Sequence, residues 1–143
     1  MSTNPQRVPS TALVMIAAVV SWLGLYLHNV ADLPGQTLLS PESALPAVVL
    51  LLPAGVWFTR YRRLAAGLFQ GWVWLHLVGG AILSVLPLPI LPFRPEQSLH
   101  HYAFHVVYGL AQVPLLITTI RYLRRTRLIE LTPPSSRAVE EDR

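Results

Sequence analysis

The sequence predicts an all-α integral membrane protein, a four-helix bundle of two antiparallel helical hairpins with both termini in the cytoplasm. Low charge, four apolar stretches and the distribution of arginine predict it. Apolar residues make up 52% of the 143 residues and charged residues 13%, and the mean hydropathy is +0.46. These are too few charged side chains to cover a water-soluble domain of this size. Lipid must therefore solvate much of the surface.

The four apolar stretches are each close to the length that crosses a bilayer, about 20 helical residues. The expected spans are residues 8–30, 41–59, 64–86 and 96–120. Residues 1–7 are then a cytoplasmic N-terminal tail, 8–125 the membrane domain, and 126–143 a disordered cytoplasmic C-terminal tail. Between the last two spans, prolines from Pro87 to Pro95 predict a non-helical loop that packs on the outer end of the bundle.

The basic residues indicate the orientation. All are arginine, and most lie beside an apolar stretch: Arg7, Arg60, Arg62 and Arg63, and the group that follows residue 120. The positive-inside rule places these segments in the cytoplasm and predicts a multi-pass protein of the cytoplasmic (inner) membrane. No basic stripe carries interleaved aromatic residues, so no nucleic-acid partner is expected. The expected partners are the lipid bilayer and a homo-oligomer or larger membrane complex.

Histidine is the residue type that indicates chemistry, because all five histidines lie in or beside the spans, where ionisable side chains are costly. His28, His100 and His101 are expected near the outer interface, with Asp32, Glu42 and Glu96 at the same level. His101 and His105 are spaced i, i+4 and Tyr108 follows, so the three share one helix face. The chain has no cysteine, which excludes disulfides and thiolate metal sites.

Small and polar residues line one face of two spans: Ala17, Ser21, Gly24 and His28, and Trp72, His76, Gly80 and Ser84. Such stripes favour helix contacts over lipid contacts, so spans one, three and four should converge. Nitrogen atoms from two different helices should then approach within about 5 Å. The sharpest expectations are a contact of His28 with His100 or His101, and one of His76 with His105.

The candidate metal ligands are therefore His28, His100, His101 and His105, with Asp32, Glu42, Glu96 and Tyr108 as residues that support them. His76 and His105 are the candidate cofactor-binding pair, able to hold a haem between two helices at matched depth. The cofactor expected from these residue types is a haem or a divalent transition metal.

Three functions remain open at this stage. The first is a structural or accessory component of a membrane complex, in which the histidines are hydrogen-bonded between helices. The second is a metal- or haem-binding membrane subunit that uses the histidine cluster. The third is a proton-coupled subunit that transports a small substrate, with histidine as the titrating group. No G-x-S-x-G, H-E-x-x-H or phosphate-loop motif occurs, so no enzyme activity is assigned.

The arginine asymmetry generates a topological prediction. A reporter that is active only in the cytoplasm should be active when fused after Arg127, and one that is active only outside should be active when inserted near Gly35. Reversed signals at both positions would contradict the orientation.

Overall fold

The computed structural model describes residues 8–90 and 94–131, and every regular element within them is helical. In chain order the elements are α1 (Thr11–Asp32), α2 (Pro41–Trp57), α3 (Arg62–Trp74), the π-helix η1 (Leu75–Ile82), the 3₁₀-helix η2 (Leu83–Val85) and α4 (Leu99–Leu131). The prediction of an all-helical protein is therefore confirmed.

Three helical stretches are long and apolar enough to cross a membrane: Thr11–Asp32, Arg62–Val85 and Leu99–Leu131. Helix α2 is apolar but shorter, at 17 residues. It ends before the expected residue 59 because the carbonyl of Val56 accepts hydrogen bonds from both the backbone and the side chain of Thr59, which closes the helix. Three of the four expected spans thus have the length that spanning requires.

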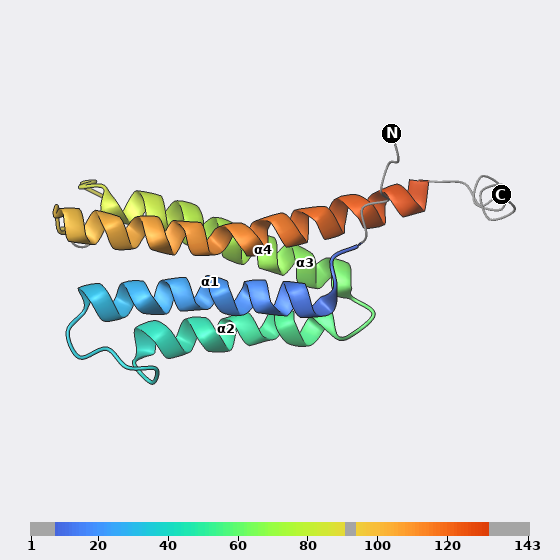
Figure 1. Ribbon diagram of the computed structural model, residues 1–143, viewed down its shortest axis with the longest axis horizontal. Coiled ribbons are helices and arrows are strands. Elements are labelled where there is room, and N and C mark those ends of the chain that lie inside the picture. Colours follow the sequence, from blue (N-terminus) through green and yellow to red (C-terminus); the bar gives the residue numbers. More distant parts are fainter. Residues whose placement is uncertain (1–7, 91–93, 132–143) are drawn as a thin grey trace, which may run out of the picture.

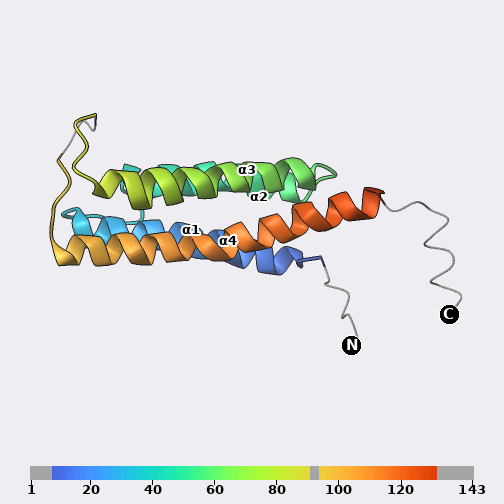
Figure 2. The ribbon, with the colours of Figure 1, turned by 90° about the horizontal axis from the view of Figure 1, so that it is seen from above.

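The helices lie side by side along one long axis (Figure 1). Helix α1 contacts both α2 and α4, and α3 contacts both α2 and α4. Figure 2 shows α4 beside α1 and α3 beside α2. We call the end where α1 finishes and α4 begins the Asp32 end. The opposite end, where α1 begins and α4 finishes, is the arginine end, and it carries Arg60, Arg62, Arg63, Arg121, Arg124, Arg125 and Arg127.

Helix α1 shows how the sequence selects the faces. Large apolar side chains point outward, and Leu13, Ile16 and Val19 are all exposed. Its buried face instead carries small and polar residues, among them Ala17, Ser21 and Gly24. This arrangement suits lipid as the outer solvent, because lipid accepts the large apolar residues and small residues allow helices to approach. The predicted inward stripe on α1 is confirmed.

A buried polar network joins three helices at mid-length. Ser21 Oγ of α1 donates to Gln112 Oε1 of α4 at 2.5 Å, and Gln112 Nε2 donates back to the Ser21 carbonyl at 3.0 Å. Trp72 Nε1 of α3 donates to Ser21 Oγ at 2.9 Å. The predicted convergence of spans one, three and four is therefore observed.

Both ends of helix α4 also differ from expectation. Helix α4 begins at Leu99 rather than at residue 96. Ser98, just before this start, accepts a hydrogen bond through its Oγ from the His101 backbone N–H at 3.2 Å. The helix also continues past Arg125 to Leu131, so residues 126–131 are helical where a disordered tail was expected. Within this extension, Glu130 forms an ion pair with Arg63 of α3, and both side chains are exposed. Residues 1–7 and 132–143 of the expected tails lie outside the described residues.

The proline-containing segment after η2 is non-helical at 87–90 and at 94–95, as predicted, and residues 91–93 lie outside the described part. The expectation that it packs on the bundle is wrong for the described residues. Pro87 and Pro89 are exposed, and Ile90 is 86% exposed. Prolines restrict the backbone and remove N–H donors, so this segment has few hydrogen bonds with which to attach to the helices.

Helices α1 and α4 pack tightly at Gly24, where an added Cβ would lie 2.3 Å from the Cβ of Ala111. We therefore predict that Gly24→Ala separates the two helices and lowers the free energy of unfolding by about 1–3 kcal/mol. Thermal unfolding in detergent measures the loss. The Ala111→Gly change in the same protein should restore stability, because it removes the overlapping methyl group. Gly55→Ala is the control, since nothing lies within 4 Å of its added Cβ, and an equal loss there would contradict the prediction.

Candidate metal centre at the Asp32 end

Two helix faces meet at the Asp32 end and carry the histidines. His28 and Asp32 are one turn apart in the last turns of α1, and His101 and His105 are one turn apart in the first turns of α4. Residues spaced i, i+4 project from the same side of a helix. The contact of α1 with α4 therefore brings two pairs of polar side chains together.

The carboxylate of Asp32 is the centre of this cluster. Its Oδ2 accepts a hydrogen bond from His101 Nδ1 at 2.7 Å and lies 2.9 Å from His28 Nδ1. The second distance is within ion-pair range, but the geometry is not that of a hydrogen bond. The Asp32 side chain is 8% exposed, so its negative charge is largely removed from water. Such a carboxylate requires a compensating positive charge nearby.

Several nitrogen atoms of the cluster have no hydrogen-bond partner. Within the described residues, four buried side-chain N or O atoms are unpartnered, and three belong here: His28 Nδ1, His101 Nε2 and His105 Nδ1. One ligand atom from each of His28, Asp32 and His105 lies within 4.8 Å of the others. His105 is only 5% exposed. The expected approach of nitrogen atoms from two helices is therefore observed for His28 and His105.

Aromatic contacts hold the rings in place. The ring centroids of His28 and His105 are 4.3 Å apart, and those of His101 and His105 are 4.4 Å apart. The Tyr108 ring stacks on His28 with an interplanar angle of 5°. In His105 the buried ring nitrogen without a hydrogen-bond partner is Nδ1, which makes it the atom available to a metal ion.

The structure places the predicted metal residues unequally. His28, His101 and His105 come together, whereas His100 is peripheral, with a side chain 61% exposed and Nε2 3.9 Å from Asp32 Oδ1. Asp32 was expected only to support the ligands, but it lies among them, because its place one turn after His28 directs it into the contact with α4.

The other supporting residues are distributed differently from expectation. Glu42 Oε2 accepts a hydrogen bond from Gln36 at 3.3 Å, and Glu96 is exposed on the segment before α4. Neither carboxylate contacts the cluster. Tyr108 does support it, by stacking on His28.

The predicted pairing of His76 with His105 is not formed. His76 Nδ1 instead shares a hydrogen bond with the hydroxyl of Tyr108, and its ring lies 3.9 Å from that of Trp72. No ring contact or hydrogen bond joins His76 to His105 in the described part of the chain. The two imidazoles contact different partners, so the geometry does not support a haem between them.

Two polar residues near the site were not singled out from the sequence. Asn29 Nδ2 of α1 donates to the Glu42 carbonyl at 2.9 Å and lies 3.4 Å from Ser43 Oγ, which fixes the start of α2 beside the cluster. Gln112 is one turn beyond Tyr108 and donates to its carbonyl at 3.3 Å. The signal for Gln112 was available, since it continues the helix face of His101, His105 and Tyr108.

Two imidazoles and one carboxylate form a donor set that binds zinc or iron(II) in proteins. His105 also lines a mostly apolar groove of about 360 Å³ between η1 and α4. No protein-family model, curated protein or solved structure matches the chain. The chemistry of the site is therefore argued from its geometry.

Tyr108 allows a test of the support around the cluster. Tyr108→Phe removes the hydroxyl that bonds to His76 and leaves the half-buried His76 Nδ1 without a partner, which should lower the free energy of unfolding by about 1–3 kcal/mol. Thermal unfolding in detergent measures it. Tyr102→Phe is the matched control, because its hydroxyl bonds to Gln97 at an exposed site and its loss should change stability by about 0.5 kcal/mol or less. Equal effects would contradict the proposed support.

Proposed function

We propose that this chain is a multi-pass protein of the cytoplasmic membrane whose four helices cross the bilayer as two antiparallel hairpins, with both termini in the cytoplasm. Three helices have the required length. Helix α2 lies alongside α1 and α3, and apolar side chains such as Leu45, Val48 and Leu52 are exposed along it. The arginines gathered at one end favour that end as the cytoplasmic one.

Within this bundle, the function supported best is the binding of one divalent transition-metal ion by His28, Asp32 and His105. The observation that carries the proposal is that one ligand atom each from His28, Asp32 and His105 lies within 4.8 Å of the others, in a cluster where His28 Nδ1 and His105 Nδ1 have no hydrogen-bond partner. Buried polar atoms are almost always hydrogen-bonded, so unpartnered atoms concentrated at one point require an explanation. A metal ion accepts their lone pairs and supplies that explanation.

The spacing needs only a small adjustment to hold a metal. Bonds of about 2.0–2.1 Å in a tetrahedral site separate neighbouring ligand atoms by about 3.4 Å. On binding, separations near the 4.8 Å limit would shorten, whereas the 2.9 Å between His28 Nδ1 and Asp32 Oδ2 would lengthen slightly. Because His28 and Asp32 share one helix and His105 comes from another, binding would also fasten the end of α1 to the start of α4.

The charge of the cluster also favours a cation. Asp32 contributes one buried negative charge, and a divalent ion compensates it directly. His101 acts as a positioning residue, since its Nδ1–H holds Oδ2 of the carboxylate at 2.7 Å. Histidine and carboxylate pairs of this kind orient ligands around protein-bound metals.

The role expected of such a protein is that of an accessory component within a homo-oligomer or larger membrane complex. The apolar face of α2 offers a surface on which other membrane segments could pack. Metal binding is the activity that can be tested on the isolated chain.

The test is metal content. We expect protein purified in detergent and loaded with Zn²⁺, then freed of excess metal, to retain about one ion per chain. Bound Zn²⁺ should also raise the unfolding temperature, because a ligand at 100 times its dissociation constant stabilises the folded state by about 2.7 kcal/mol. Elemental analysis by mass spectrometry gives the stoichiometry.

Two variants and one control locate the site. His105→Gln and Asp32→Asn should each lose the bound ion and the thermal shift. His100→Gln should keep both, because His100 is exposed and peripheral to the cluster. Wild-type protein that retains neither Zn²⁺ nor Fe²⁺ would overturn the proposal, and so would full retention by the His105→Gln and Asp32→Asn variants.

A further inference from the structure

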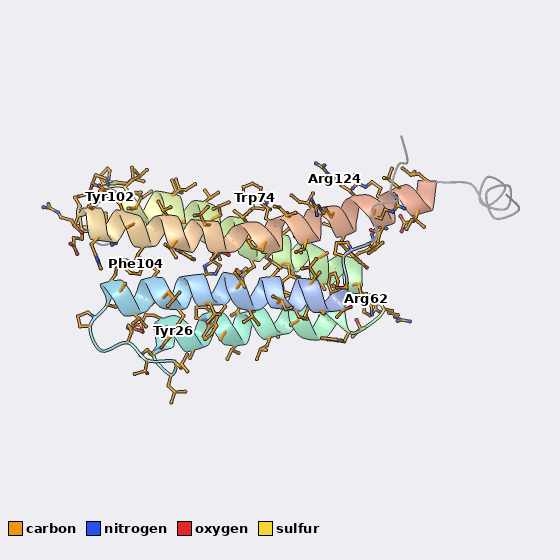
Figure 3. The ribbon with its side chains drawn as sticks, viewed as in Figure 1. Tyr26, Arg62, Trp74, Tyr102, Phe104 and Arg124 are labelled. Carbon is orange, nitrogen blue, oxygen red and sulfur yellow. The ribbon has the colours of Figure 1, made fainter. Side chains whose placement is uncertain are left out.

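A second site lies at the arginine end, between α3 and α4. A cavity of about 290 Å³ there is lined by Arg63, Gln70, Ile120, Leu123, Arg124 and Arg127. Figure 3 shows Arg62 and Arg124 toward this end of the molecule and Tyr102 and Phe104 toward the other. The cavity is therefore remote from the candidate metal centre.

The periodicity of the helices explains why these residues gather. Positions 120, 123, 124 and 127 of α4 follow the spacing of one helix face. Arg63 and Gln70 of α3 are two turns apart and share a face in the same way. The facing stripes thus place three guanidinium groups and two aliphatic side chains, Ile120 and Leu123, around one cavity.

The charges of the cavity are incompletely compensated. Arg63 forms an ion pair with Glu130. Arg124 and Arg127 are exposed, and neither has an ion pair or side-chain hydrogen bond within residues 8–90 and 94–131. Guanidinium groups bind phosphate oxygens through paired hydrogen bonds. Two free guanidinium groups on one face are suited to bind a phosphate.

We propose that this cavity binds the headgroup of an anionic phospholipid, with the phosphate held by Arg124 and Arg127 and the upper part of an acyl chain lying against Ile120 and Leu123. The cavity is lined by both arginine and aliphatic side chains. This combination favours a lipid over a soluble phosphate, because a lipid has both a charged headgroup and an apolar chain. Basic pockets between membrane helices on the cytoplasmic side bind such headgroups. The site uses none of the residues proposed for the metal.

The experiment measures lipid binding to the full chain in detergent by native mass spectrometry, with dioleoyl phosphatidylglycerol as the anionic lipid and dioleoyl phosphatidylcholine as the neutral lipid of equal chain length. Wild-type protein should bind phosphatidylglycerol and show much weaker binding of phosphatidylcholine. The double variant Arg124→Gln/Arg127→Gln should weaken binding of phosphatidylglycerol about thirtyfold, as expected for two lost charges near a headgroup.

The matched control is Arg121→Gln/Arg125→Gln, which removes the same charge from the same helix at positions outside the cavity lining. It should leave the affinity for phosphatidylglycerol near that of the wild type. An equal loss in both double variants would show general surface attraction and overturn the site. Equal binding of the two lipids would overturn it too, as would displacement of phosphatidylglycerol by inorganic phosphate at equal concentration.

Discussion

Buried polar groups that have no access to water need hydrogen-bond partners inside the protein. In this chain the contact between α1 and α4 supplies many of these partners. Gly24 allows the two backbones to approach, because any side chain there would overlap Ala111. The same approach lets Ser21 reach Gln112 and lets Asp32 reach His101. Without it, several buried donors and acceptors would lack a partner inside the bundle, which in an apolar environment costs several kcal/mol each. Packing and the candidate site thus depend on one helix pair.

The two ends of the molecule are stabilised differently. Toward the arginine end, the core is apolar and aromatic, with Trp57 1% exposed and its ring 4.7 Å from that of Tyr122. Toward the Asp32 end, the side chains between the helices are mainly imidazoles, a carboxylate and Tyr108 instead of apolar residues. The π-helix η1 lies against this polar part, and Gly80 leaves space for the Tyr108 ring, since an added Cβ would lie 2.5 Å from the hydroxyl. The apolar core at the arginine end can therefore hold the helices in place, while some polar atoms at the Asp32 end have no hydrogen-bond partner.

Much of this arrangement could be predicted, and the errors have definite causes. The inward stripe of Ser21, Gly24 and His28 was readable, because helical spacing shows which residues share a face. The role of Asp32 was underestimated. Position along the helix axis shows how deep a residue lies in the bundle, but not which side chain of a neighbouring helix it contacts. His76 and His105 illustrate the same limit. They lie on neighbouring helices, yet His76 contacts Tyr108 and His105 contacts His28.

The sequence by itself determined the helical class, the apolar outer faces and the gathering of arginine at one end, because these follow from composition and from periodicity along single helices. Tertiary structure alone decided which side chains meet, where α4 ends and how the arginines of α3 and α4 come to line one cavity. Helix ends depend on partners such as the Arg63–Glu130 ion pair. Contacts between helices depend on their rotation and separation, which arise from the packing of small residues such as Gly24 against another helix and are not encoded in any single segment.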